Sequence, residues 1–68
     1  MTQPQPEVLE VEARAEAVQI KMSVVLREAG VPASTWWRWR KGGVEPKVTT
    51  LRKVRHSLDR LASEQAAA

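Results

Sequence analysis

Residues 22–41 have the sequence MSVVLREAGVPASTWWRWRK, which predicts two short helices joined by a tight turn. The turn is expected at Gly30, because glycine readily adopts the left-handed backbone conformation that ends many helices. Pro32 cannot continue the first helix but suits the start of the next one. Val31, between them, is expected to point inward and pack between the two helices. The second helix is predicted over residues 33–41.

This second helix has two chemically different faces. At about 100° per residue, Trp36 and Trp39 lie within about 60° of each other and form an apolar face. A tryptophan ring has a large apolar area, so a ring exposed on the other face indicates a contact with a partner. We expect Trp36 and Trp39 to be core and Trp37 to face a partner; the alternative is that all three rings are core. The other face carries Ser34, Trp37, Arg38 and Lys41.

The charge of the chain is unevenly distributed. Residues 1–30 carry three basic and five acidic side chains (−2), whereas residues 31–60 carry eight basic and two acidic ones (+6). Residues 61–68 add one glutamate, which gives the net charge of +3. Such asymmetry favours an anionic partner, nucleic acid before membrane. The alternative is an ordinary solvated basic surface.

The composition narrows the class of protein. The 68 residues make one domain with a modest core, and dimerisation commonly supports a core of this size. The chain has no cysteine and one histidine, so we expect no disulfide and no metal site. It has no catalytic or phosphate-loop motif, so no enzyme, no cofactor and no small-molecule substrate is predicted. With no apolar run of ~20 residues and no signal-peptide pattern, the expected location is cytoplasmic and no membrane contact is predicted.

Two helices are predicted before the turn. Residues 7–18 contain no glycine or proline and have apolar residues at helical spacing. Residues 19–21 contain no strong breaker, so the boundary with the helix over residues 22–29 stays open, and Ser23 could instead cap that helix. Residues 1–6, rich in glutamine and proline, are expected to be a disordered arm. The side chains expected inward are Val8, Val11, Ala15, Val18, Val25, Leu26 and Ala29.

A last helix is predicted after the glycine pair at residues 42–43, which ends the preceding helix. It starts near Val48, runs past Leu61 and is followed by a flexible alanine-rich tail over residues 64–68. The domain is therefore predicted to be all-α and to span residues 7–63. The apolar stripe of the last helix consists of Val48, Leu51, Val54, Leu58 and Leu61.

Two segments resemble the lambda-repressor-like helix-turn-helix proteins, which include phage repressors, Cro proteins and XRE-type regulators. Residues 29–42, AGVPASTWWRWRKG, are similar to the family pattern A-G-V-S-x-S-T-I-S-R-W-E-x-G. Residues 46–54, PKVTTLRKV, followed by Leu58, are similar to P-S-L-x-T-L-x-K-I followed by a leucine. The resemblance covers roughly residues 18–60.

The resemblance implies a bundle of four or five helices that binds double-stranded DNA sequence-specifically as a homodimer. Its base-contacting surface corresponds to Ala33, Ser34, Trp37 and Arg38, and a phosphate contact corresponds to Lys47. Arg38 is expected to donate two hydrogen bonds to guanine O6 and N7. The expected function is a small bacterial or phage transcriptional regulator that represses by occluding a promoter. The residues expected to hold phosphates are Lys41, Lys47 and Arg52.

Three positions depart from the family pattern. Leu26 stands where alanine is preferred, and Trp36 stands where isoleucine or valine is usual, so bulkier side chains separate the two helices. Arg40 stands where a glutamate commonly pairs with an arginine of the first helix. Because the first helix here carries Glu12 and Glu16, we expect the same pair with its charges exchanged.

Two other functions fit parts of the pattern. Excisionase-like or architectural DNA-binding factors share S-T-x-x-R-W-x-x-G, but they continue into a β-wing where this chain is predicted to form a helix. An antitoxin-type protein-interaction module would use the surface around Trp37 to bind a protein. The homodimer surface is expected at the end of the last helix, around Leu58 and Leu61, with the first helix as a further candidate.

Overall fold

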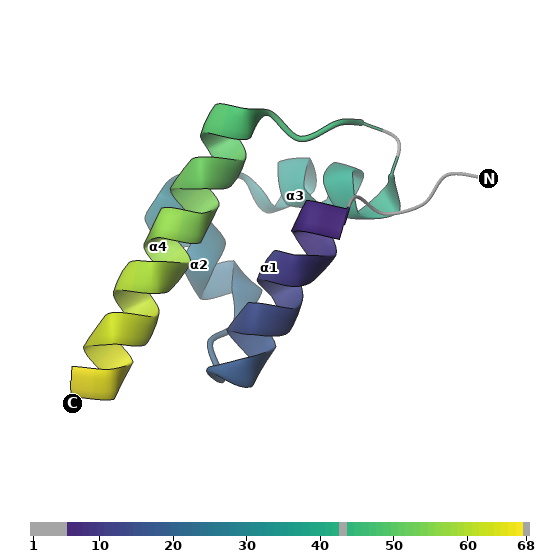
Figure 1. Cartoon of the computed structure of the whole chain (residues 1–68). Coiled ribbons are helices and arrows are strands. Elements are labelled where there is room, and N and C mark those ends of the chain that lie inside the picture. Colours follow the sequence, from purple (N-terminus) through teal and green to yellow (C-terminus); the bar gives the residue numbers. More distant parts are fainter. Residues whose placement is uncertain (1–5, 43, 68) are drawn as a thin grey trace.

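Four α-helices joined by short connections make up the structure, a computed structural model that describes residues 6–42 and 44–67 (Figure 1). Within these residues there is no strand, which confirms the all-α four-helix prediction. None of the described helices combines the length and hydrophobicity needed to cross a membrane. The helices are α1 (Pro6–Ala17), α2 (Met22–Ala29), α3 (Ala33–Lys41) and α4 (Val48–Ala67).

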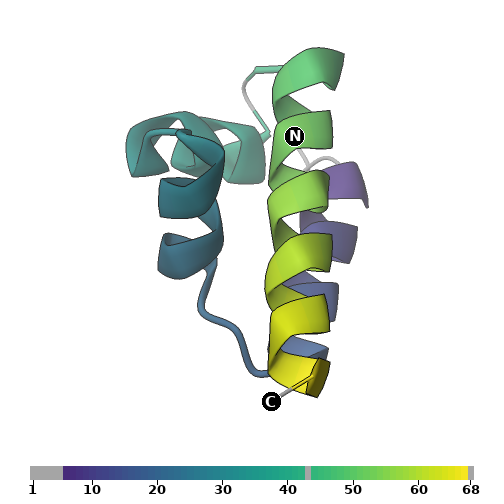
Figure 2. The ribbon, with the colours of Figure 1, turned by 90° about the vertical axis from the view of Figure 1, so that its left-hand side faces the viewer.

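The helices form two layers. α1 and α4 run in the same direction in one layer, and α2 and α3 lie behind them (Figures 1 and 2). α2 packs along α4, whereas α3 lies across the end of the bundle and contacts α1. One side of α3 therefore meets the core, and its opposite side faces outward.

The core lies between the two layers. Trp36 and Trp39 are 4% and 3% exposed, and their rings pack at a centroid distance of 5.6 Å with a 56° tilt. Val31 is buried in the turn between α2 and α3, as predicted. Val18, Ala29, Leu51 and Leu61 are partly buried against this core. The other buried apolar residues are Val8, Val11, Ala15, Val25, Leu26, Val54 and Leu58.

The turn between α2 and α3 has the predicted geometry. Gly30 has φ 72°, and its amide donates a hydrogen bond to the carbonyl of Arg27 at 3.2 Å. The amide of Val31 donates to the carbonyl of Leu26 at 2.9 Å. This pair of bonds satisfies carbonyls at the end of α2 and turns the chain toward α3. Gly42, with φ 84°, ends α3 in the predicted way; Gly43 lies outside the described residues.

The end of α1, which the sequence left open, uses the same motif without glycine. Gln19 has φ 60° and donates its amide proton to the carbonyl of Glu16 at 3.0 Å. The amide of Ile20 donates to the carbonyl of Ala15 at 2.9 Å. Gln19 therefore occupies a left-handed conformation that is costly for residues other than glycine. α1 ends at Ala17, and Val18 already belongs to this turn.

Several predicted boundaries are wrong. Pro6 belongs to α1 and not to an N-terminal arm, and residues 1–5 lie outside the described residues. α4 continues to Ala67, because glutamine and alanine extend a helix well; the predicted tail over residues 64–68 is therefore helical up to that point, and Ala68 is outside the described residues. The predicted bounds of α2, Met22–Ala29, are confirmed; Ser23 lies inside this helix, so the alternative that it caps the helix is wrong.

Two members of the apolar stripe of α4 also differ from expectation. Val48 is 70% exposed, because the first turn of α4 lies at the edge of the bundle. Leu58 is fully buried in the core of its own chain. It is therefore unavailable as part of a dimer surface, and of the predicted pair only Leu61, partly buried, retains exposed area.

Candidate nucleic-acid interface

The outward side of α3 carries the residues predicted to contact DNA bases. Trp37 is 52% exposed, in contrast to the buried Trp36 and Trp39. This difference confirms the predicted division of the three rings and excludes the alternative that all of them are core. The outward residues, each exposed, are Ala33, Ser34, Trp37, Arg38 and Lys41.

One carboxylate on α1 fixes the orientation of α3. Glu12 Oε2 accepts a hydrogen bond from Trp36 Nε1 at 3.0 Å, and Glu12 Oε1 lies 3.3 Å from Arg40 Nε. The predicted charge-exchanged pair is confirmed for Glu12, whereas Glu16 forms no ion pair within the described part of the chain. Trp36 and Arg40 are one helical turn apart, so a single carboxylate can reach both.

The hydrogen bond from Trp36 was not anticipated from the sequence. A buried indole N–H usually finds an acceptor, so the need for one was foreseeable. Which carboxylate would supply it depends on how α1 crosses α3, and residue spacing alone does not specify that crossing.

Two cations flank the exposed ring of Trp37. The guanidinium carbon of Arg40 lies 5.6 Å from the ring centroid, and Lys41 Nζ lies 5.5 Å from it. Both residues come after Trp37 by three or four positions, which brings their side chains onto the same part of the helix surface. The distances are within the range of cation–π attraction. Arg40 therefore connects Trp37 to Glu12, and through Glu12 to the core.

A hollow separates the outward side of α3 from the start of α4. Its volume is about 440 Å³, and Arg38, Lys47 and Lys53 all line it, together with Thr35 and Thr50. The structure thus brings the predicted base contact Arg38 and the predicted phosphate contact Lys47 to one hollow. The exposed carboxylate of Glu45 also lines this hollow and partly offsets its positive charge.

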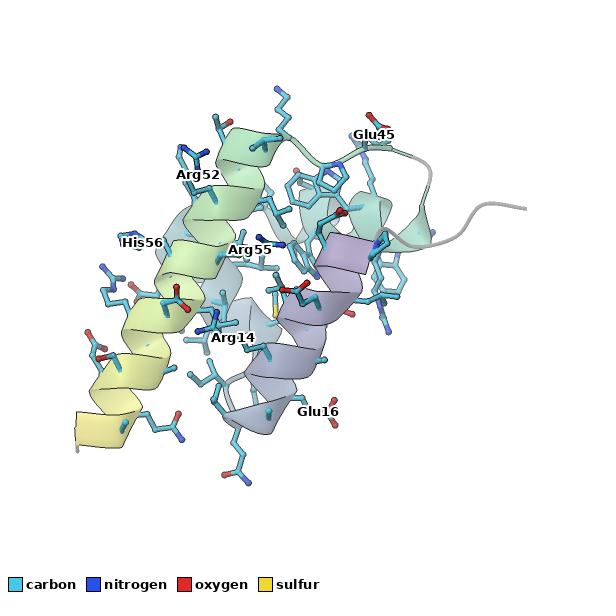
Figure 3. All side chains as sticks on the ribbon, in the orientation of Figure 1. Arg14, Glu16, Glu45, Arg52, Arg55 and His56 are labelled. Carbon is cyan, nitrogen blue, oxygen red and sulfur yellow. The ribbon has the colours of Figure 1, made fainter. Side chains whose placement is uncertain are left out.

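Lys53 and Arg52 are adjacent on α4, but only Lys53 lines this hollow. Lys53, which sequence reasoning did not single out, shares the hollow with Arg38 because it lies three residues after Thr50 and points the same way. Arg52 does not line this hollow; it lies on the outer side of α4 with His56 (Figure 3). Arg55 points from α4 toward the α1 side. Of the predicted phosphate contacts Lys41, Lys47 and Arg52, Lys47 lines this hollow, whereas Lys41 and Arg52 do not.

The ion pairs of the described residues leave the cations of this interface unpaired. Arg14 pairs with Asp59, Arg60 Nη2 pairs with Glu28 Oε2 at 2.6 Å, and Arg40 pairs with Glu12. The acidic partners in these three pairs, Asp59, Glu28 and Glu12, lie on α4, α2 and α1 and not on α3. No ion pair within the described ranges involves the cations Arg38, Lys41, Lys47 and Lys53.

The outward side of α3 is suited to a partner rich in negative charge and hydrogen-bond acceptors. Its polar groups are hydroxyl, indole, guanidinium and ammonium donors, and Ala33–Lys41 contains no carboxylate. Phosphate oxygens and the guanine edge are acceptors of the matching kind. Comparisons with protein-family models, with curated proteins and with solved structures found no match to this chain.

Proposed function

We propose that this chain binds double-stranded DNA sequence-specifically by placing α3 in the major groove, like the lambda-repressor-like proteins that its sequence resembles. The observation that carries the proposal is the two-sided character of α3. Trp36 and Trp39 are buried, while Trp37, Arg38 and Lys41 are exposed on a helix with no carboxylate. The major groove of B-DNA admits an α-helix, and side chains on its outward side meet base edges there.

The residues around α3 divide into base contacts and phosphate contacts. Arg38 is the proposed bidentate donor to guanine, with Ala33 and Ser34 near the helix start at base edges. Lys41 and Lys47 would hold phosphates on the two sides of the groove. We add Lys53 to the phosphate contacts because it lines the same hollow as Arg38 and Lys47. Arg52, which does not line this hollow, could reach only flanking phosphates.

The proposed biological role is that of a small bacterial or phage transcriptional regulator located with the DNA in the cytoplasm. A bound protein would repress by covering a promoter. A helix-turn-helix contacts one half-site, so we propose that two copies occupy two half-sites related by a two-fold axis. The dimer surface would exclude Leu58, which the core of each chain already buries.

The proposal has two alternatives. The first differs in the structure of the segment after α3, and the second differs in the molecule that Trp37 contacts. An excisionase-like or architectural factor would continue into a β-wing, but residues 44–47 are irregular and α4 begins at Val48. An antitoxin-type module would use the exposed ring of Trp37, 52% accessible, to bind a protein. Binding to DNA separates this second alternative from the proposal.

The test is selection of bound duplexes from a random DNA pool, followed by gel-shift titration. We expect enrichment of one motif and tighter binding to it than to scrambled duplexes, by several orders of magnitude for a specific regulator. Arg38→Ala should lose the part of this preference that depends on one base pair, about 1–3 kcal/mol. Arg14→Ala is the matched control, because it removes the same charge from α1 on the side toward α4 (Figure 3). A pool that shows no enrichment would reject sequence-specific DNA binding.

A further inference from the structure

We infer that Trp37 determines specificity by contacting the C5-methyl group of a pyrimidine, which is thymine in unmodified DNA. This inference rests on the proposed binding of α3 in the major groove. It assigns a chemical target to the one large apolar group on the outward side of that helix.

The first observation is the position of the ring. Trp37 is 52% exposed, and apart from the small Ala33 the outward residues around it are hydroxyl-bearing or cationic. The buried rings of Trp36 and Trp39 already provide the apolar contacts of α3 with the core. The core does not cover the Trp37 ring. Its apolar area is therefore removed from water only when a partner binds over it.

The second observation is that the ring is held in place before any partner binds. Arg40 and Lys41 place their cationic groups 5.6 and 5.5 Å from its centroid. Arg40 is in turn paired with Glu12, which also accepts the hydrogen bond of the buried Trp36. A side chain restrained in this way loses less rotamer freedom on binding, so a small contact can still be selective.

The chemistry of the major groove supplies the target. The base edges there present acceptors and amino donors, and the C5-methyl of thymine is their apolar feature. Trp37 has one donor, its indole N–H, and an extensive apolar ring. Arg38 is adjacent in sequence and lines the hollow toward α4. The two side chains therefore diverge by about 100° around the helix, so that a guanine edge and a nearby methyl group can be contacted together.

The flanking cations favour this contact over others. They draw phosphates toward the edges of the groove, which brings the ring of Trp37 toward its floor. A contact of the ring with a sugar would not distinguish thymine from uracil. Stacking on a base would require that base to leave the duplex, which costs unstacking energy.

The experiment replaces single thymines in the selected duplex by deoxyuridine, which removes only the methyl group. For the wild-type chain we expect about fourfold weaker binding at one thymine in each half-site, the loss typical of one buried methyl or methylene. Trp37→Ala should bind the thymine and uracil duplexes equally. Trp37→Phe should keep part of the preference. Arg38→Ala should keep the methyl preference while losing that for guanine.

Each other outcome has a definite meaning. If every deoxyuridine duplex binds the wild-type chain as tightly as the parent duplex, or if the penalty persists in Trp37→Ala, the assignment of Trp37 is wrong while DNA binding stands. Equal weakening of thymine and uracil duplexes by Trp37→Ala, with no methyl effect in the wild type, would indicate a sugar contact and overturn it. Failure to enrich any duplex from the pool would reject the proposed function, and this inference with it.

Discussion

Glu12 and Trp36 are joined by a hydrogen bond of 3.0 Å that links two helices across 24 residues of sequence. The second oxygen of the same carboxylate lies 3.3 Å from Nε of Arg40, one turn further along α3. Because Arg40 also lies against the ring of Trp37, the carboxylate connects the buried side of α3 to its outward side. The orientation of the proposed DNA-contacting helix therefore depends on one residue of α1.

Removing this carboxylate should weaken the fold measurably. Glu12→Ala leaves the buried N–H of Trp36 without its acceptor, so we expect a loss of about 1–3 kcal/mol in the free energy of unfolding. Glu12→Gln keeps an acceptor and loses only the partly exposed ion pair, about 0–1 kcal/mol. Urea unfolding followed by circular dichroism measures both. Glu16→Ala, one turn away and exposed without an ion pair, is the control and should change stability by less than about 0.5 kcal/mol.

The neighbouring tryptophans of α3 should respond very differently to truncation. Trp36→Ala empties a buried site and should cost about 3–5 kcal/mol, enough to unfold much of so small a domain. Trp37→Ala removes only an exposed ring and its attraction to two cations, about 0.5–1 kcal/mol. Thermal unfolding of the two variants gives the comparison. Similar losses for both would contradict the division of α3 into a buried and an outward side.

Two of the left-handed turns, at Gln19 and Gly30, permit a paired stability measurement. Gly30→Ala introduces a Cβ that has no neighbour within 4 Å, so it causes no steric clash with other residues. We expect it to lower the free energy of unfolding by about 1–2 kcal/mol, because alanine is strained in the left-handed backbone conformation. Gln19→Gly relieves the same kind of conformation and should raise the free energy of unfolding by up to about 1 kcal/mol. Both changes are read from urea unfolding curves. A destabilised Gln19→Gly variant would mean that the glutamine side chain contributes more than its backbone costs.

Much of the fold was predictable because local signals agree with one another. Gly30 and Pro32 mark the turn, and the spacing of Trp36 and Trp39 marks the buried side of α3. The end of α1 was predicted to within one residue, but the left-handed turn at Gln19 was not foreseen because glutamine is not a residue typical of turns. Val48 was misplaced because periodicity continues beyond the point where neighbouring helices stop covering α4.

The candidate interface was predictable where it lies on a single helix and less so where two elements meet. The outward residues of α3 can be read from its helical wheel alone. The choice between Arg52 and Lys53 depends on how α4 is rotated toward α3, which only the packing of α4 determines. The Glu12–Arg40 pair was inferred from the ion pair of the family pattern with its charges exchanged, whereas the contacts of Trp37 with Arg40 and Lys41 result from helical spacing and were overlooked.

The proposed dimer should be visible on DNA. We expect sedimentation at micromolar concentration to give two copies of the chain on a duplex with two half-sites. Leu58→Ala should lower stability by about 2–5 kcal/mol through its own core and leave that stoichiometry unchanged at temperatures where the variant is folded. One copy per duplex under all conditions would reject the dimer. A stoichiometry that falls in folded Leu58→Ala would return this residue to the interface.

The last prediction separates base recognition from phosphate binding. Arg38 and Lys47 line one hollow, but Arg38 projects from the middle of α3 and Lys47 precedes α4. Arg38→Ala should cost about 1–3 kcal/mol on the selected duplex and relax the preference at one base pair. Lys47→Ala should weaken selected and random duplexes alike and lower the salt slope by about one. Titrations at several salt concentrations distinguish the two patterns.

Lys53 and Arg52 supply the internal comparison for this prediction, since they are adjacent cations on α4 and only Lys53 lines the hollow beside α3. If the hollow beside α3 faces the phosphates, Lys53→Ala should resemble Lys47→Ala in its salt slope, and Arg52→Ala should change the slope much less. Both cations are exposed, so neither substitution should affect folding by more than about 0.5 kcal/mol. A larger effect of Arg52 than of Lys53 would place the phosphates on the outer side of α4, and α3 would then have to approach DNA in a different orientation.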